Sequence, residues 1–269
     1  MAEGSDKGMR GSYASPAYSY ARPLERWLRG RGLDPVPVPT ASAGSLIESG
    51  RAVAGIVPLG SIAKGEGLLT CPGPMVYSEY TTMSVAVFSA THRRLRDCPV
   101  VAVTPETRTS VLYLEAVIAE KGLRTRLRRA RTASHRGLLR EAPCALIIGD
   151  EALRALAAGA HVVMDVGEAV YETLGAAPVY AATVAKNECP RGVAEPPWPS
   201  PEPGDVAETI RATGLDSGLA WLYHYELLRL DYNPSALYKA LKLLEILAER
   251  SRWAQPAAAR PQAPIAMSG

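Results

Sequence analysis

Two short strand-like segments, far apart in the sequence, constrain the fold more than any other feature. The first ends the stretch Thr81–Ser89 (TTMSVAVFS), which has an apolar second half and polar residues at both ends. The second is Val179–Val184 (VYAATV), which is equally rich in small and β-branched residues. Short apolar runs of this kind are typical of buried strands. We therefore predict that these two strands join two lobes, with a ligand cleft between them.

The segment between these two strands has the pattern of a small α/β lobe. Strands are predicted at Pro99–Val103, Cys144–Ile148 and His161–Asp165, and helices at Thr109–Gly122 and Asp150–Ala158. The helix Thr109–Gly122 is the clearest of these, because its apolar residues recur at helical spacing and a glycine ends it. The order β-α-β-α-β predicts a doubly wound lobe.

The flanking segments predict the other lobe. Before the first joining strand we expect a strand end and loop at Ser12–Tyr20, a helix at Pro23–Arg31, an edge strand at Pro35–Pro39, a helix at Thr40–Gly50, a strand at Ala52–Leu59 and a loop at Ser61–Pro74. After the second, a proline-rich linker (187–205) precedes three helices at Val206–Gly214, Gly218–Leu230 and Pro234–Trp253. Residues 1–88 and 186–269 are therefore predicted to form one lobe, and residues 89–185 the other.

Composition excludes several classes of protein. The 269 residues carry a formal net charge of only +3, which argues against a nucleic-acid partner. The N-terminal residues lack the apolar core of a signal peptide, and no apolar run approaches the roughly 20 residues that span a bilayer. Cys71, Cys98, Cys144 and Cys189 form no CxxC pair. We expect a cytoplasmic protein with four reduced thiols; disulfides are the alternative for a hyperthermophilic source.

Five segments, taken in order, resemble a known family. They are VAGIVPLGSIA (53–63), SVAVFS (84–89), TRTSVLYLEAVI (107–118), IIGDEALRAL (147–156) and DVGEAVYETLGAAPVYAATVA (165–185). Together they resemble the chorismate dehydratase family of the futalosine route to menaquinone. The run IGDEAL and the segment DVGEAVYETLG are the most specific parts. The resemblance covers most of residues 10–186.

The resemblance implies an α/β fold of the type II periplasmic-binding-protein class, with two lobes, two crossing strands and a ligand between them. It implies a lyase that dehydrates chorismate to 3-[(1-carboxyvinyl)oxy]benzoate, without a metal or an organic cofactor. The partner would be this small anionic substrate, and the protein a monomer or a homodimer. A solute-binding protein of the same fold, the related 1,4-dihydroxy-6-naphthoate synthase and a relative with another small anionic ligand remain alternatives.

Chorismate is a dianion, so its site must hold two carboxylates. The free amide groups at a helix N-terminus bind carboxylates well. Thr109 and Ser110 open the clearest predicted helix, and the Arg108 guanidinium precedes them. We predict that these three residues bind a substrate carboxylate. A plain helix cap at Thr109 and a solvated Arg108 are the structural alternatives.

Hydroxyl groups are the other candidates. The resemblance assigns substrate contact to Ser84, and Thr82 lies beside it. The family's first loop carries a Ser-Tyr-Leu-Asn run, which here reads Ser12-Tyr13-Ala14-Ser15. Ser15 replaces the substrate-contacting Asn, and a serine reaches less far than an amide. We predict catalytic roles for Ser84 and Ser15 and substrate binding by Thr82 and Tyr13; a buried strand serine is the alternative for Ser84.

Two more residues of the matched segments complete the predicted site. Asp150 opens a predicted helix and would either cap it or order the cleft, and Tyr171 would pack on a ligand ring or in the core. None of the four histidines falls in a matched segment, so no protein base is indicated. In that case the enolpyruvyl carboxylate of chorismate would itself accept the ring proton, while the protein positions and stabilises.

Overall fold

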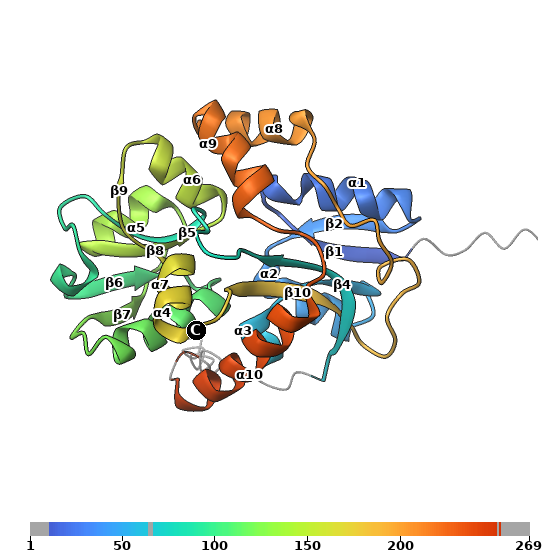
Figure 1. Ribbon diagram of the computed structural model, residues 1–269, viewed down its shortest axis with the longest axis horizontal. Helices are drawn as coiled ribbons and strands as arrows, with labels where there is room; N and C mark the ends of the chain where they lie inside the picture. The colour runs from blue at the N-terminus through green and yellow to red at the C-terminus, as the bar shows by residue number, and fades with distance from the viewer. Residues whose placement is uncertain (1–10, 64–66, 252, 254–269) are drawn as a thin grey trace, which may run out of the picture.

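The computed structural model describes residues 11–63, 67–251 and 253, and the N-terminal segment on which the signal-peptide argument rests lies outside them. Two five-stranded sheets define two lobes that lie side by side (Figure 1). The strands are β1 Ser12–Pro16, β2 Asp34–Val38, β3 Ala54–Pro58, β4 Leu69–Tyr77, β5 Val85–Ser89, β6 Val100–Val103, β7 Arg126–Arg129, β8 Cys144–Ile148, β9 His161–Asp165 and β10 Val179–Ala185.

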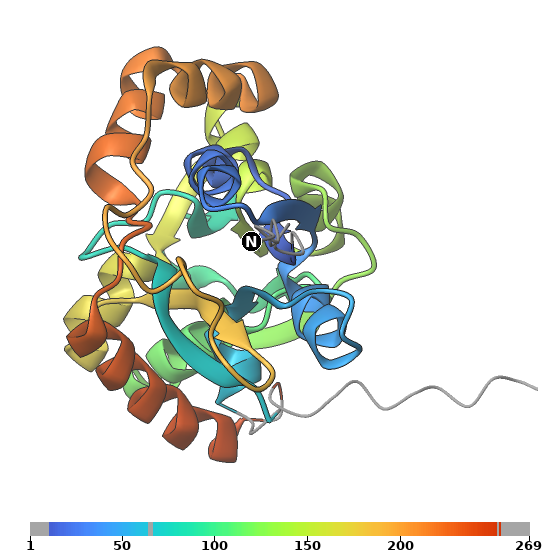
Figure 2. The ribbon, with the colours of Figure 1, turned by 90° about the vertical axis from the view of Figure 1, so that its right-hand side faces the viewer.

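Helices cover both sheets and pack at their edges. The α-helices are α1 Arg22–Gly30, α2 Thr40–Glu48, α3 Leu59–Ile62, α4 Thr109–Glu120, α5 His135–Glu141, α6 Asp150–Ala157, α7 Val166–Leu174, α8 Pro203–Thr213, α9 Ser217–Leu222 and α10 Pro234–Arg250. Short 3-10 turns lie at Ser19–Ala21 and Leu95–Asp97, and a π-helical turn at Tyr223–Leu227 follows α9. The C-terminal helices lie along one side, with α8 and α9 at one end and α10 at the other (Figure 2).

Lobe 1 is built on the sheet β2-β1-β3-β10-β4. Strand β1 pairs in parallel with β2 and β3, as the alternation of strands and helices predicts. Strand β2, with its two prolines, lies at the edge, where a missing amide donor breaks no ladder. The predicted loop over 61–74 was wrong in its second half, because β4 begins at Leu69 and pairs with β10.

Lobe 2 is built on the sheet β7-β6-β8-β5-β9. Three of its strands, β6, β7 and β8, are parallel, and β5 runs antiparallel between β8 and β9. The predicted strands and helices of this lobe are confirmed, but β7, α5 and α7 were missed. Strand β7 is arginine-rich, and at the sheet edge three of its four side chains reach solvent.

The two joining segments differ from the expected crossing strands. All of β5 pairs within lobe 2 and all of β10 within lobe 1, so neither strand is shared between the sheets. The chain passes between lobes at residues 78–84 and 175–178, a few residues before the boundaries we predicted. Met83 in the first crossing has a φ of 64°, the one positive φ among the described non-glycine residues. The Asp165 carboxylate holds this turn, since it accepts hydrogen bonds from the backbone amides of Thr82 and Met83.

The four cysteines form two disulfides, so the expectation of reduced thiols was wrong. Cys71 of β4 is joined to Cys189 in the linker after β10, within lobe 1. Cys98 is joined to Cys144 of β8, within lobe 2. The bonded cysteines are 118 residues apart in the first bridge and 46 in the second. Pairings over such distances leave no local pattern in the sequence. Disulfides are rare in ordinary cytosolic proteins and common in oxidising compartments and in hyperthermophiles.

Candidate functional site between the lobes

A cavity of about 70 Å³ lies where the two lobes meet. It is smaller than the roughly 300–1,000 Å³ of an ordinary ligand pocket. A ring compound with two carboxylates therefore enters only when the lobes separate. The lining residues come from both lobes: Tyr18, Tyr20, Thr40, Pro58, Val76, Thr82, Ser84, Val85, Glu106, Arg108, Thr109, Ser110, Ile148, Gly149, Tyr180, Ala181 and Leu228.

The start of α4 forms one wall of this cavity. Arg108, Thr109 and Ser110, which we predict to bind a substrate carboxylate, all line it. No side chain caps this helix, and the first amide groups of an α-helix have no partner within it. The Ser110 hydroxyl makes no hydrogen bond to another described residue. The wall therefore offers an arginine, a free hydroxyl and helix amides to an anion.

The Thr109 hydroxyl, which we predict to bind substrate, instead bonds to the backbone of the other lobe. That hydroxyl donates to the Tyr180 carbonyl of β10 at 2.7 Å and accepts from the Gly60 amide at 3.0 Å. Both partners belong to lobe 1, so Thr109 ties α4 to the opposite lobe. The hydroxyl already donates its one proton to Tyr180, so only the Thr109 backbone amide is free to donate to a ligand.

Ser84 presents a hydroxyl whose proton is free. It lies in the first crossing, just before β5, and is almost fully buried. Its oxygen accepts a hydrogen bond from the Tyr223 hydroxyl at 3.0 Å, and it donates to no described residue. Tyr223 is completely buried, and burial raises its pKa far above the ordinary value. A neutral phenol thus fixes the Ser84 oxygen and leaves its O–H to point at a ligand.

Thr82 lines the cavity but is held by its neighbours. Its hydroxyl contacts the Ser78 hydroxyl at 2.8 Å and the Tyr180 hydroxyl at 2.6 Å. Its amide donates to the Asp165 carboxylate, which also accepts from Gly167 and Glu168 at the start of α7. Burial raises the pKa of Asp165 and these amide donors lower it, with burial the larger effect. Thr82 therefore shapes the wall rather than offering a free hydroxyl.

Four predicted residues lie outside the cavity lining. Tyr13 is buried in lobe 1, where its hydroxyl contacts Thr183 at 2.8 Å. Ser15 is also fully buried, and its hydroxyl has no hydrogen-bond partner. Tyr171 is 51% exposed and packs edge-on against Tyr80. Asp150 does not cap its own helix, because Gly149 holds that position and the Asp150 carboxylate binds Ser19 of lobe 1.

The lining also holds residues that were not predicted, and three of them bear on how a ligand would bind. Tyr18 and Tyr20 form an aromatic wall, with their rings stacked 5.6 Å apart and tilted by 20°. Glu106 supplies a carboxylate to the lining, in the loop before α4. The segment Ser12–Tyr20 is rich in tyrosine, and this was the available signal. Among the described residues, no group of three or more His, Cys, Asp or Glu is placed to hold a metal ion.

Solved structures show which class of fold this is. The alkanesulfonate-binding protein SsuA from Xanthomonas axonopodis pv. citri, bound to MOPS, aligns with a TM-score of 0.64 at 14% identity, over 91% of this chain and 93% of its own. The aliphatic sulphonate-binding protein SsuA from Escherichia coli gives 0.59 at 12% identity (89% and 86%), and AF1704 from Archaeoglobus fulgidus gives 0.58 at 15% (89% and 96%). The predicted two-lobed type II periplasmic-binding-protein fold is confirmed.

The family follows from a sequence model. The model described as menaquinone biosynthesis matches residues 57–197, which is more than half of the chain. The chain belongs to this menaquinone biosynthesis family, as its resemblance predicts, and membership implies an enzyme. No curated protein matches the chain at a significant level. Within the part of the chain that the structure describes, no helix has both the length and the apolar character needed to cross a membrane.

Proposed function

We propose that the protein is a lyase that converts chorismate to 3-[(1-carboxyvinyl)oxy]benzoate and water, as a step of menaquinone biosynthesis through futalosine. The observation that carries the proposal is the uncapped start of α4, which lines the cavity between the lobes with Arg108 and Ser110. Membership of the menaquinone biosynthesis family supports a role in menaquinone biosynthesis. The reaction needs an anion site and a hydrogen-bond donor, and Arg108, Ser110 and the amide groups of α4 would supply both.

The geometry suggests how each group acts. One substrate carboxylate binds the amide groups at the start of α4 and the Arg108 guanidinium, which is a charge-assisted contact. Tyr18 and Tyr20 contact the ring face. The Ser84 hydroxyl donates to an oxygen of the substrate, and Tyr223 keeps it aimed. A base takes one ring proton and passes it to the departing ring hydroxyl, which leaves as water, and aromatisation drives the reaction.

The proton acceptor is proposed to be the enolpyruvyl carboxylate of the substrate. Glu106 is the one protein carboxylate among the described residues that line the cavity, so it is the alternative base. Its charge also opposes a dianionic ligand at the same wall. A substrate that carries its own base needs only positioning and electrostatic stabilisation from the protein.

The proposal is tested by incubating chorismate with the wild-type protein and with the Glu106→Gln variant in parallel. Loss of the diene absorbance is followed, and the product is identified by mass. We expect the enolpyruvyl-oxybenzoate from both proteins, because the substrate supplies the base. Product from the wild type alone would assign the base to Glu106. Chorismate unchanged by both proteins would refute the dehydratase function.

A second candidate is a binding protein for a small anion without turnover. The two disulfides favour it, since they are typical of proteins in oxidising compartments. A thermal-shift measurement beside the chorismate incubation separates the two functions, because a binding protein would be stabilised by its anion and would leave chorismate intact. The cytoplasmic location that the sequence analysis favours remains a prediction.

A further inference from the structure

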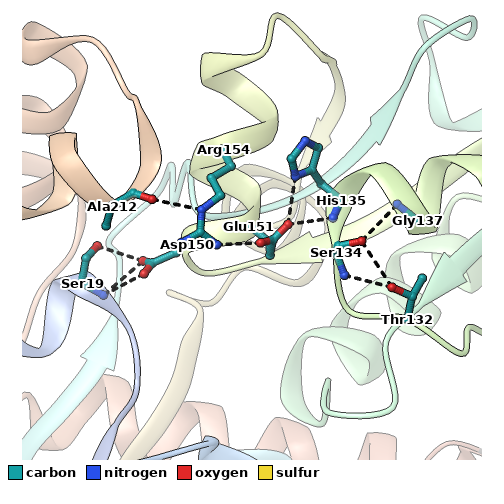
Figure 3. A network of polar contacts seen from close by, with 9 residues as sticks. All are labelled: Ser19, Thr132, Ser134, His135, Gly137, Asp150, Glu151, Arg154 and Ala212. Carbon is teal, nitrogen blue, oxygen red and sulfur yellow. Dashed lines mark hydrogen bonds and ion pairs between the residues drawn. The ribbon is translucent and has the colours of Figure 1, made fainter.

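The start of α6 in lobe 2 binds the loop that carries the aromatic wall of lobe 1. The Asp150 carboxylate accepts hydrogen bonds from the Ser19 amide at 3.0 Å and from the Ser19 hydroxyl at 2.8 Å (Figure 3). Ser19 lies between Tyr18 and Tyr20, whose stacked rings line the cavity. Through one residue, a carboxylate of lobe 2 therefore fixes both tyrosines of lobe 1.

Two further contacts join α6 to lobe 1 beside this carboxylate. Gly149 packs so closely on Tyr18 that a β-carbon on it would lie 2.4 Å from the ring atom Cε1. The Arg154 guanidinium donates to the Ala212 carbonyl of α8 at 3.0 Å and is held by Glu151, which also contacts His135 (Figure 3). Helix α6 therefore contacts lobe 1 in two further places: Gly149 packs on Tyr18 at its start, and Arg154 binds α8 one turn later.

A buried chain of hydrogen bonds supports Ser19 from behind. The Thr209 hydroxyl donates to the Ser19 hydroxyl at 3.0 Å and contacts His224 Nε2 at 2.8 Å. Because its single proton goes to Ser19, the Thr209 oxygen accepts from the Nε2–H of a neutral His224. Burial lowers the pKa of His224, which favours this neutral form. The donors therefore run in one direction, from His224 to Asp150.

The Asp150 carboxyl group at the end of this chain is mostly buried, and burial shifts its pKa. Burial raises the pKa of Asp150, and its bonds to Ser19 and the nearby Arg154 only partly offset this. Asp150 accepts from two buried donors, the amide and the hydroxyl of Ser19. An unpaired buried amide and hydroxyl would make the closed arrangement costly, whereas water satisfies both when the lobes part.

We propose that Asp150 is a positioning residue which, by binding Ser19 across the cleft, holds the Tyr18–Tyr20 wall over the cavity and keeps the lobes closed. The closed arrangement is then present before any ligand binds. The effect on a ring-shaped substrate rests on the proposed function, but the effect on the lobes does not. A distance between the lobes is therefore the first readout.

The test uses two spin labels, one on each lobe. Arg211→Cys on α8 and Arg124→Cys in lobe 2 replace exposed side chains, and the four native cysteines are held in disulfides, so the labels attach only at the introduced sites. The distance distribution is measured by electron spin resonance without ligand. The variants are Asp150→Ala, Asp150→Asn and Gly149→Ala.

Gly159→Ala is the matched control for Gly149→Ala. Both glycines flank α6 and have positive φ, at 61° and 76°, so alanine is strained at each. Only Gly149 has Tyr18 in the way; nothing lies within 4 Å of a β-carbon on Gly159. Gly149 also has a ψ of −143°, a region that is almost restricted to glycine, so the Gly149→Ala result is interpreted together with Asp150→Ala, which leaves both glycines in place.

We expect one narrow distance for the wild type, Asp150→Asn and Gly159→Ala, and a longer or broader distribution for Asp150→Ala and Gly149→Ala. Asparagine at position 150 keeps an oxygen that accepts from the Ser19 amide, so the two lobes should stay closed in that variant. With chorismate, Asp150→Ala is expected to lower KM up to about tenfold, because the closed cavity of about 70 Å³ is too small for the substrate and the contact that must break before entry is gone. The variant is also expected to lower kcat, because the Tyr18–Tyr20 wall is no longer held over the ring. An Asp150→Ala distribution that coincides with the wild type would overturn the proposal, as would a ligand-free wild type that is already open. If chorismate proves not to be the substrate, the distances alone decide.

Discussion

Replacing Ser84 with alanine is expected to lower kcat for chorismate about 10²–10³-fold, with a smaller effect on binding. This is the cost of removing one preorganised donor from a site that excludes water. The Ser84 hydroxyl is such a donor, since Tyr223 occupies its oxygen at 3.0 Å and no described residue takes its proton. Steady-state kinetics with purified protein measures the effect.

Two variants control for indirect effects of this change. Tyr223→Phe keeps the Ser84 hydroxyl but removes the phenol that aims it, so we expect a loss of about tenfold. Ser78→Ala removes a buried hydroxyl of the same crossing; this hydroxyl contacts Thr82, and Ser78 does not line the cavity. The Ser78 variant should therefore turn over chorismate at close to the wild-type rate. Equal losses in the Ser84 and Ser78 variants would mean that the crossing, and not the Ser84 donor, is what turnover requires.

Removing the Cys71–Cys189 disulfide, by replacing both residues with alanine, is expected to lower the free energy of unfolding by about 4 kcal/mol. The bridge spans 118 residues, and a cross-link over a loop of that length restricts the unfolded chain strongly. The Cys98–Cys144 bridge spans 46 residues and lies within lobe 2, so its removal should cost somewhat less. Urea unfolding of both double variants gives the two values.

Reduction of the wild-type protein provides the control for the disulfide variants. A thiol reductant should shift the wild-type unfolding midpoint toward those of the variants and leave a protein without either bridge unchanged. Thiol titration of the unreduced, unfolded protein should find no free cysteine. Four reactive thiols in that experiment would show that the bridges do not form, and would restore the expectation of a reduced protein.

The strands and helices were predictable where local pattern decides the structure. The apolar period of α4 and the runs that became β3, β8 and β9 are visible in the sequence, and family resemblance supplied their arrangement. Strand β4 was missed because its prolines and glycine suggest a loop, although its last five residues are buried. Its pairing with β10 is a long-range contact that no local pattern encodes.

The residues of the candidate site were predictable where they lie at the start of a helix or strand. They were not predictable where only long-range contacts bring them to the cavity. Arg108, Thr109, Ser110 and Ser84 were found because they open α4 or precede β5. Tyr18 and Tyr20 were missed because only the meeting of the lobes brings them to the cavity. Tyr13 and Ser15 were misplaced for the opposite reason, since the fold buries β1 in the middle of the lobe 1 sheet.

The cavity between the lobes is the proposed place of the reaction, and every role proposed for a residue depends on it. A crystal structure of the protein with the enolpyruvyl-oxybenzoate product bound tests it most directly. We predict the product between Tyr18 and the start of α4, with one carboxylate on the amides of Thr109 and Ser110 and an oxygen within hydrogen-bond distance of Ser84. Product bound elsewhere, with this cavity still closed and empty, would contradict the account.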